Sequence, residues 1–300
     1  MKVLGLPSNL VHQKRTLVMG VINVTSDSFS DGGDNLDIEV AIASGLRMIQ
    51  DGADIIDIGG ESTRPGAERT SHEEETARVL PVIRALSHSA AIISVDTMRA
   101  RVAAEAVEAG AHIVNDVSGG LADPAMAEFI AAARIPYVVM HWRGHSDEMS
   151  QHATYKKVTK EVRKELSQRI EDLVRRGVDF EQIIVDPGLG FAKEPEHNWT
   201  LLHEIEELEK LERPLLVGHS RKRFLGELLN DRPAKAREYA TVAVTSLLAE
   251  RKIWGVRQQL LSKQIGFVTH SFHAGQPILR FAIVNPRTDE SDFAAILSQL

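Results

Sequence analysis

The sequence lacks cysteine altogether, and its 300 residues include only three tryptophans and three tyrosines. Without cysteine there is no disulfide, no thiolate nucleophile and no sulfur-bound zinc or iron–sulfur centre, which fits a reducing compartment. The N-terminal residues do not form a signal peptide, so we predict a cytoplasmic protein. No apolar run approaches the ~20 residues that a membrane span needs, and we expect no membrane partner. Basic residues are fewer than acidic ones, 35 against 42, and the net charge of −7 argues against nucleic acid as a partner.

Short β-branched apolar runs alternate with helical patterns along the chain. The runs lie at residues 17–22, 55–58, 92–95, 113–114, 137–140, 183–185, 215–217 and 253–256. Between them, apolar residues recur at three- and four-residue spacing, as in Val79, Val82 and Leu86. Strands that alternate with helices predict an α/β protein with a parallel sheet, and eight such units predict a closed (β/α)8 TIM barrel.

The two ends of the chain fall outside this rhythm. We predict one barrel domain over residues 1–257, whose first 16 residues form a short hairpin that plugs the N-terminal end of the barrel. Residues 258–300 are predicted to be an atypical C-terminal segment that completes or flanks the barrel. In that segment, Ile278–Val284 predicts an extra strand and Ser291–Leu300 predicts a short amphipathic helix.

Polar side chains follow the predicted strands at the end where TIM barrels carry their active sites. They are Asn23, Asp57 with Gly59-Gly60, Asp96, Asn115-Asp116, His141, Asp186, His219-Ser220-Arg221-Lys222 and Arg257. Strand ends also need polar caps and turn residues, so any single position has an ordinary structural explanation. Together, however, they would bring carboxylates, amides, a lysine and an arginine into one pocket. We therefore predict a binding site for a polar ligand at this end of the barrel.

Several common chemistries lack their motifs here. Gly218-His219-Ser220-Arg221-Lys222 has no closing glycine of a nucleophile elbow, and Gly188-Leu189-Gly190 is only a fragment of a dinucleotide fingerprint. His141 and His145 stand four apart in a glycine-containing loop without a carboxylate between them, and we interpret them as surface-loop residues rather than metal ligands. A Schiff-base aldolase that uses Lys222 stays open, although this lysine follows its strand in a basic loop.

Two glycine-containing loops carry a resemblance to a known family. The segment Asn23-Val24-Thr25-Ser26-Asp27-Ser28-Phe29-Ser30-Asp31-Gly32-Gly33 resembles the first loop of dihydropteroate synthases, and Gly59-Gly60-Glu61-Ser62-Thr63-Arg64-Pro65-Gly66 resembles the second. Ser94–Thr97, Asn115-Asp116, Asp186–Phe191 and Ser220–Lys222 follow in the family's order and spacing, and the resemblance extends to Arg257. It implies a transferase that condenses 6-hydroxymethyl-7,8-dihydropterin pyrophosphate with 4-aminobenzoate to 7,8-dihydropteroate and pyrophosphate, in folate biosynthesis.

The resemblance also implies roles for individual residues. The pterin pyrophosphate would be bound by polar side chains from six positions: Thr63, Asp96, Asn115, Asp186, Lys222 and Arg257. The 4-aminobenzoate would be bound by loop residues: Phe29, Thr63, Arg64, Pro65, Phe191 and Ser220. Asn23 would be the one protein ligand of Mg²⁺. The catalytic residues would be Lys222, Asp31 and Arg257, with Asp31 stabilising a cationic pterin. Asp57 would be a buried structural or pterin-side carboxylate. Sulfonamides are the implied inhibitors, and a homodimer is the implied assembly.

The sequence departs from the family after Arg257. Family members place a histidine two residues beyond this arginine, whereas Gln258 and Gln259 stand here. Two other functions therefore stay open. One is a pterin-binding paralogue with weak or no synthase activity, because the Arg-x-His phosphate motif is incomplete. The other is the pterin-binding module of a corrinoid-dependent methyltransferase, which would need neither the aminobenzoate residues nor the pyrophosphate residues.

Overall fold

The structure is a computed structural model that describes residues 3–11, 15–25, 34–61, 69–145, 149–250, 255–258, 268–273 and 276–281. Parallel strands form one eight-stranded sheet in the order β6-β5-β4-β3-β2-β1-β8-β7. Their bounds are β1 (Leu17–Asn23), β2 (Ile55–Gly59), β3 (Ile92–Asp96), β4 (Ile113–Asp116), β5 (Tyr137–Met140), β6 (Ile183–Asp186), β7 (Leu216–Gly218) and β8 (Gly255–Gln258). A parallel bridge between Val185 and Leu215 joins the two edge strands. The sheet therefore closes, and the predicted (β/α)8 barrel is confirmed.

The strands are apolar because both of their faces are covered. All five residues of β2 and all four of β5 are buried, with one face toward the barrel interior and the other toward the helices. The last predicted strand, at residues 253–256, overlaps β8 at residues 255–256, and its first two residues lie outside the described residues. Its register is set by backbone pairing, in which Arg257 lies beside Met19 of β1 and Gly218 of β7. Arg257 is therefore part of the strand and does not follow it.

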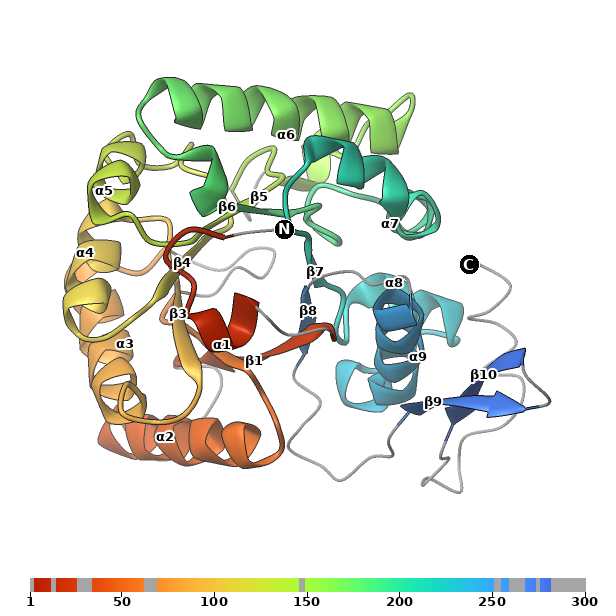
Figure 1. The fold of residues 1–300 in the computed structure, drawn as a ribbon, viewed down its shortest axis with the longest axis horizontal. Helices are drawn as coiled ribbons and strands as arrows, with labels where there is room; N and C mark the ends of the chain where they lie inside the picture. The colour runs from red at the N-terminus through yellow and green to blue at the C-terminus, as the bar shows by residue number, and fades with distance from the viewer. Residues whose placement is uncertain are drawn as a thin grey trace.

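Helices surround the ring of strands (Figure 1). They are α2 (Asp34–Gln50), α3 (His72–Leu86), α4 (Ala100–Glu108), α5 (Met126–Ala133), α6 (Val158–Arg175), α7 (Pro195–His203), α8 (Arg223–Leu228) and α9 (Glu238–Glu250), with 3₁₀ turns at Met149–His152, Phe180–Gln182, Ile205–Leu211 and Ala234–Ala236. The helices are held by apolar stripes at helical spacing, as in α3, where Val79, Val82 and Leu86 are fully buried. Among the described residues, no helix is both long and apolar enough to span a bilayer.

The N-terminal segment covers the end of the barrel where the strands begin (Figure 1). It contains the short helix α1 (Ser8–Val11) within residues 3–11, so the predicted hairpin is wrong for these residues. The predicted plug is confirmed, because Val3, Leu6 and Leu10 pack onto the apolar first residues of the strands. α1 begins directly after Pro7, whose carbonyl oxygen accepts from the backbone N–H groups of Leu10 and Val11 at 3.0 and 3.2 Å. Proline is common at the N-terminus of a helix.

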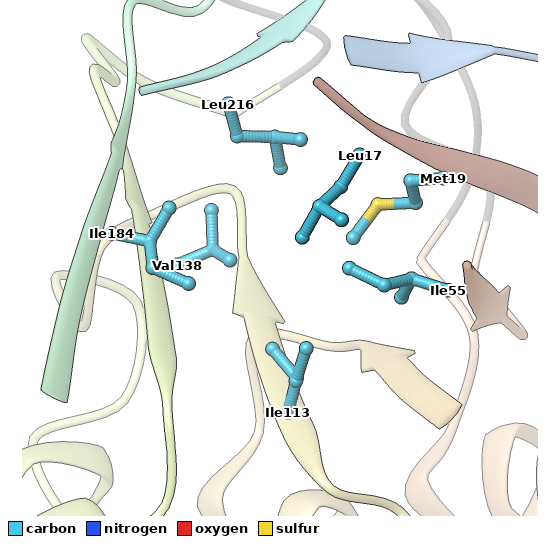
Figure 2. Close-up of a pocket in the computed structure, with 7 residues that line it drawn as sticks. All are labelled: Leu17, Met19, Ile55, Ile113, Val138, Ile184 and Leu216. Atoms are coloured by element: carbon cyan, nitrogen blue, oxygen red, sulfur yellow. The ribbon is translucent and has the colours of Figure 1, made fainter. Parts of the chain in front are cut away.

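Behind the plug, side chains from six strands point toward one another (Figure 2). They are Leu17, Met19, Ile55, Ile113, Val138, Ile184 and Leu216, and they line a cavity of ≈ 10 Å³. A space of that size holds about one water molecule, and its apolar walls offer that water no partners. This end of the barrel is therefore a packed core. Polar chemistry is left to the opposite end, where the strands finish.

After β8, the described residues form an antiparallel hairpin of β9 (Val268–His273) and β10 (Gln276–Phe281). The extra strand predicted at Ile278–Val284 overlaps β10, whereas its partner β9 was not predicted. The helix predicted at Ser291–Leu300 lies outside the described residues. The division into a barrel domain and a C-terminal segment remains a prediction.

Candidate functional site

Backbone pairing places three of the predicted site positions in one row across neighbouring strands. Asn23 of β1 lies opposite Gly59 of β2, Gly59 lies opposite Asp96 of β3, and Asp96 lies opposite Asn115 of β4. A methyl group at Gly59 would lie 3.3 Å from Cβ of Asp96 and 3.7 Å from Oδ1 of Asn23. Glycine at this position therefore leaves room between the predicted metal ligand and the first predicted pterin ligand.

Below this row, a buried hydrogen bond orients Asn115. Its Nδ2 donates to Oδ2 of Asp57 at 3.0 Å, and neither residue is more than 2% exposed. This hydrogen bond fixes the orientation of the amide, whose Oδ1 is the atom that can accept a hydrogen bond from a ligand. The prediction of a buried carboxylate at Asp57 is confirmed, and its structural role is to fix the amide of Asn115.

Asp186 ends β6 and begins the loop to α7. One of its carboxylate oxygens accepts from the backbone N–H of Gly188 at 2.7 Å. The loop then takes up left-handed backbone conformations at Gly188, Gly190 and Ala192, with φ of 66°, 75° and 46°. Two of these positions need glycine for a second reason, since a methyl group would lie 2.5 Å from the carbonyl oxygen of His141 at Gly188 and 2.9 Å from Cδ of Lys222 at Gly190. The glycines allow this loop to lie directly against β5 and Lys222.

Lys222 and Phe191 meet above this loop. The ammonium of Lys222 lies 4.4 Å from the centre of the Phe191 ring, and it donates to the backbone carbonyl of Leu189. The stacked pair joins the loop after β6 to the loop after β7, and a cation over an aromatic face is stabilising. Nearby, the Ser220 hydroxyl oxygen is buried and has no hydrogen-bond partner among the described residues. The structure thus brings Lys222 and Phe191 together, as the resemblance implied.

The start of the loop after β7 is fixed from below by His219. Its Nε2 lies 3.0 Å from Oγ1 of Thr245 and 3.1 Å from the carbonyl oxygen of Thr241, both in α9. Burial lowers the pKa of His219 to about 4, so the ring is neutral at physiological pH. Arg221, with φ of 56°, is held by an ion pair of 2.9 Å with Glu238. These contacts set the path of the chain that carries Ser220 and Lys222.

Five predicted site residues lie outside the described residues: Phe29, Asp31, Thr63, Arg64 and Pro65. The flanks of the second loop are described, and Arg99 connects them. Its guanidinium donates to Glu61 at 2.5 Å and to the backbone carbonyl of Thr70. For Arg257 the structure describes the backbone, which lies between β1 and β7.

A buried polar cluster at the end of β5 was missed by the sequence analysis. His141, interpreted from the sequence as a surface-loop residue, is only 3% exposed, and that interpretation is wrong. Its Nε2 lies 2.9 Å from Glu165 of α6, and its Nδ1 lies 3.0 Å from the ammonium of Lys193. The sequence offered one signal for Lys193, which is its position in the glycine-rich loop two residues after Phe191. His145 instead packs edge-on against Trp142 at 4.9 Å.

The electrostatics of this cluster are unusual. Burial, together with the positive charge of Lys193, lowers the pKa of His141 to about 4. Burial also lowers the pKa of Lys193 to about 7, assisted by the charge of Lys222 and opposed by Asp186. Burial alone would raise the pKa of Glu165, but hydrogen bonds from His141 and Arg143 hold it at about 2. At neutral pH the cluster therefore contains a neutral imidazole between a carboxylate and a lysine that is close to titration.

The residues at the strand ends suit a hard cation. Among the described residues, no group of three or more His, Asp or Glu side chains is placed to bind a metal. The amide oxygen of Asn23 is a hard donor of the kind that Mg²⁺ accepts when substrate phosphates and water supply the other ligands, so Asn23 fits the predicted role of its one protein ligand.

Comparison with known proteins assigns this arrangement to a family. The model of the pterin binding enzyme family matches residues 19–258. The dihydropteroate synthase of Mycobacterium leprae is 49% identical over 246 residues, which cover 80% of this chain and 87% of that protein. The corresponding protein of Bacillus subtilis is 44% identical over 242 residues, which cover 80% and 82%.

Solved structures agree with this assignment. The dihydropteroate synthase of Xanthomonas albilineans with 4-aminobenzoic acid has a TM-score of 0.77 at 40% identity, covering 83% of this chain and 90% of that one. The Yersinia pestis enzyme in a sulfonamide drug complex has a TM-score of 0.79 at 38% identity, covering 87% and 94%.

Proposed function

Since the chain belongs to the pterin binding enzyme family and, within it, to the dihydropteroate synthases, we propose that it condenses 6-hydroxymethyl-7,8-dihydropterin pyrophosphate with 4-aminobenzoate. The products are 7,8-dihydropteroate and pyrophosphate, and the enzyme is a transferase of folate biosynthesis. One observation supports this function most directly. The end of the barrel opposite the plug carries Asp96, Asn115 and Asp186, which are the side-chain types that complement a pterin ring.

A pterin presents a row of N–H donors and of nitrogen and carbonyl acceptors. Asp96 and Asp186 accept from the N–H groups, and Oδ1 of Asn115 accepts from another, with Asp57 fixing the orientation of that amide through its Nδ2. Lys222 lies over the Phe191 ring, where its ammonium can donate to an acceptor on the pterin and offset the charge of the two carboxylates. These contacts orient the ring and hold its exocyclic carbon beside the aminobenzoate subsite.

The leaving pyrophosphate needs positive charge. Arg257 is the proposed protein cation for it, with Thr63 as a hydroxyl donor and Asn23 as the protein ligand of Mg²⁺. Bound Mg²⁺ would neutralise the phosphate oxygens and so favour departure of the leaving group. The electron-rich dihydropterin can spread the positive charge that then develops, and Asp31 would stabilise it electrostatically. The amine of 4-aminobenzoate attacks the exocyclic carbon, a new C–N bond replaces the broken C–O bond, and the amine loses one proton.

The aminobenzoate would lie between the first two loops and Phe191. Phe29, Arg64 and Pro65 are proposed on the loops, and the hydroxyl of Ser220, which has no partner in the described part of the chain, can donate to the substrate carboxylate. The enzyme from Yersinia pestis has been solved with a sulfonamide drug. We propose sulfonamides as inhibitors here for the same subsite. A homodimer and a cytoplasmic location remain predictions from the sequence.

The function is tested by incubating the purified protein with both substrates and measuring dihydropteroate and released pyrophosphate, with Mg²⁺ and after its removal with EDTA. We expect product only when both substrates are present, and a loss of turnover with EDTA that added Mg²⁺ restores. Pterin binding by calorimetry without any turnover would instead support the pterin-binding paralogue, for which the substitution of Gln259 for the family's histidine is the motivating observation. Absence of both binding and turnover in a folded protein would contradict the proposed function.

A further inference from the structure

The loop between β6 and α7 is tied down at nearly every backbone carbonyl. The carbonyl oxygens of Gly188 and Phe191 both accept from the ammonium of Lys193 at 3.0 Å. The carbonyl of Leu189 accepts from Lys222, and that of Ala192 accepts from the Tyr155 hydroxyl at 3.0 Å. Side-chain contacts, and not backbone pairing as in a strand or a helix, therefore determine the shape of this loop.

The loop needs such ties because its conformation is strained. Ala192 has a φ of 46°, a left-handed conformation that disfavours residues with a Cβ atom. A conformation of this kind persists only where the surroundings enforce it. Lys193 is adjacent to the strained residue and makes two of the loop's carbonyl contacts, so it is the side chain best placed to enforce it.

The third donor of Lys193 connects the loop to two other elements. An ammonium has three N–H groups, and the third points to Nδ1 of His141 at 3.0 Å. Since Nδ1 accepts, the ring proton of a neutral His141 must be on Nε2, which then donates to Glu165 at 2.9 Å. Arg143 donates to both oxygens of that carboxylate, with its Nε 2.9 Å from the same Oε2 that His141 contacts and its Nη2 on Oε1. The chain of contacts allows only one tautomer of His141, because the other would place a lone pair against the carboxylate of Glu165.

We propose that Lys193 is a positioning residue for the pterin site: its ammonium, oriented by His141 and Glu165, holds the β6–α7 loop in the shape that places Asp186 and Phe191 against the substrate. The pterin ligand in this proposal rests on the proposed function, whereas the effect of Lys193 on the loop does not. Lys193 itself lies beneath the loop, 9% exposed, and contacts backbone and His141 rather than open space. It therefore acts through the loop and not on the reacting atoms.

The charge of Lys193 makes the loop sensitive to pH. Burial and the charge of Lys222 lower its pKa to about 7, with Arg143 acting in the same direction and Asp186 and Glu165 opposing it. Loss of the proton above that pH turns one donor into a lone pair, which then faces a carbonyl oxygen or Nδ1 of His141. One of the three contacts is lost, and the loop loosens. A net hydrogen bond corresponds to roughly 2- to 13-fold in an equilibrium constant, so pterin affinity should fall by about that factor between pH 6 and pH 8.5.

The stability of the fold should respond in the opposite direction. The pKa of Lys193 is about 7 in the folded protein against a reference of 10.5 for an unburied lysine. Between these two values the unfolded chain binds more protons than the folded one, and the contribution of Lys193 to stability therefore rises with pH across this window. A residue that only stabilises the fold would not lower affinity while stability rises.

The test compares the protein with Lys193→Met and with a matched surface variant, Lys210→Met, whose ammonium pairs with Glu207 at 2.6 Å and is 60% exposed. Calorimetric affinity for 6-hydroxymethylpterin is measured from pH 6 to 8.5, together with amide hydrogen exchange of residues 186–193 without ligand. Lys193→Met should bind at least about tenfold more weakly at pH 6, lose the fall in affinity above pH 7 and exchange faster in the loop. Lys210→Met should behave like the parent protein. Titration of the pterin itself affects the parent protein and both variants equally, so it does not account for a difference between them.

A second variant keeps the test valid if Lys193→Met does not fold. Glu165→Gln removes a negative charge that raises the pKa of Lys193, so the midpoint of the pH dependence should move to lower pH. Glu161→Gln is the control, because Glu161 also faces Arg143 at 3.5 Å but hydrogen-bonds to the backbone of Lys156 and Lys157 rather than to His141. An unchanged midpoint in Glu165→Gln, or unchanged loop exchange in a folded Lys193→Met, would overturn the proposal. A parent protein that binds no pterin but shows the expected loop exchange would instead contradict the proposed function alone.

Discussion

The two ends of the barrel are built from the same eight strands, but one end is apolar and packed whereas the other carries polar side chains. Where the strands begin, Leu17, Ile55 and Ile113 fill the interior and the N-terminal segment covers them. Where they finish, Asn23, Asp96 and Asp186 follow one another around the rim. Side chains at the first end lose their contact with water on folding and stabilise the fold, whereas those at the second end keep polar groups in place for a ligand. Stability and function can therefore be altered separately by choosing the end.

Removing a rim carboxylate should have the largest effect on function. Asp186→Ala leaves two pterin N–H groups without an acceptor and frees the N–H of Gly188, which Asp186 now binds at 2.7 Å. An unsatisfied buried group costs about 1–3 kcal/mol, and two of them correspond to a loss of at least about 30-fold in kcat/KM. Steady-state kinetics and a thermal melt check this, with the exposed Asp51→Ala as control. Unchanged affinity for a pterin in the variant would remove Asp186 from the site.

Removing a core side chain at the opposite end should affect only stability. Leu17 is 1% exposed and lines the cavity behind the plug. Leu17→Ala is expected to lower the free energy of unfolding by about 2–5 kcal/mol, because it deletes buried methyl groups and enlarges the cavity. Urea denaturation measures this cost. The kcat/KM of the folded variant at low temperature should stay within about twofold of the parent value, and a larger drop would contradict the separation of the two ends.

Two glycines allow a smaller and more specific comparison. Gly190 has a φ of 75°, and a methyl group there would lie 2.9 Å from Cδ of Lys222, whereas Gly52 has a φ of 102° and nothing within 4 Å. Both alanine variants should lose about 1 kcal/mol of stability from backbone strain. Only Gly190→Ala should also weaken catalysis, by roughly 5- to 30-fold, since it displaces Lys222. Equal kinetics in the two variants would show that the contact with Lys222 does not matter.

The smallest expected effect concerns the phosphate side of the rim. A histidine at position 259 would add a charge-assisted hydrogen bond to pyrophosphate, typically about 1.5–3 kcal/mol, of which a glutamine already recovers part. The double change Gln258→Val and Gln259→His should therefore raise kcat/KM for the pterin pyrophosphate by up to about tenfold. Affinity for a pterin without phosphates should not change. Unchanged or poorer kinetics in a folded double variant would mean that position 259 does not face the phosphates.

Much of the rim could be predicted from the sequence, because a β-branched run followed by a polar residue marks the end of a buried strand. Asp96, Asn115 and Asp186 were identified in this way, and their family resemblance gave them roles. The buried contacts of Lys193 and His141 could not be predicted, since His141 meets Glu165, 24 positions away along the chain, and Lys193, 52 positions away. A lysine in a loop is usually solvated, and the position of Lys193 in the glycine-rich loop does not by itself show that this one is buried.

The errors at the two ends of the chain have a related cause. Residues 3–11 pack against strands through only a few apolar side chains, and the same residues would suit a hairpin or a helical turn. Pairing with β1 and β7 extends β8 beyond the apolar run at residues 253–256, so Arg257 lies in the strand although it was predicted to follow it. Local sequence patterns therefore predicted the elements, whereas the contacts between distant elements determined their bounds and the buried cluster.

Amide hydrogen exchange with and without bound pterin tests the central claim most directly, because it reports on both ends of the barrel in one experiment. We predict that 6-hydroxymethylpterin slows exchange in the segments that follow β3, β4, β6 and β7, above all in residues 186–193 and 219–222, and leaves residues 3–11 unchanged. Protection confined to the plugged end, or an absence of any change at saturating pterin, would contradict the assignment of the site to the rim.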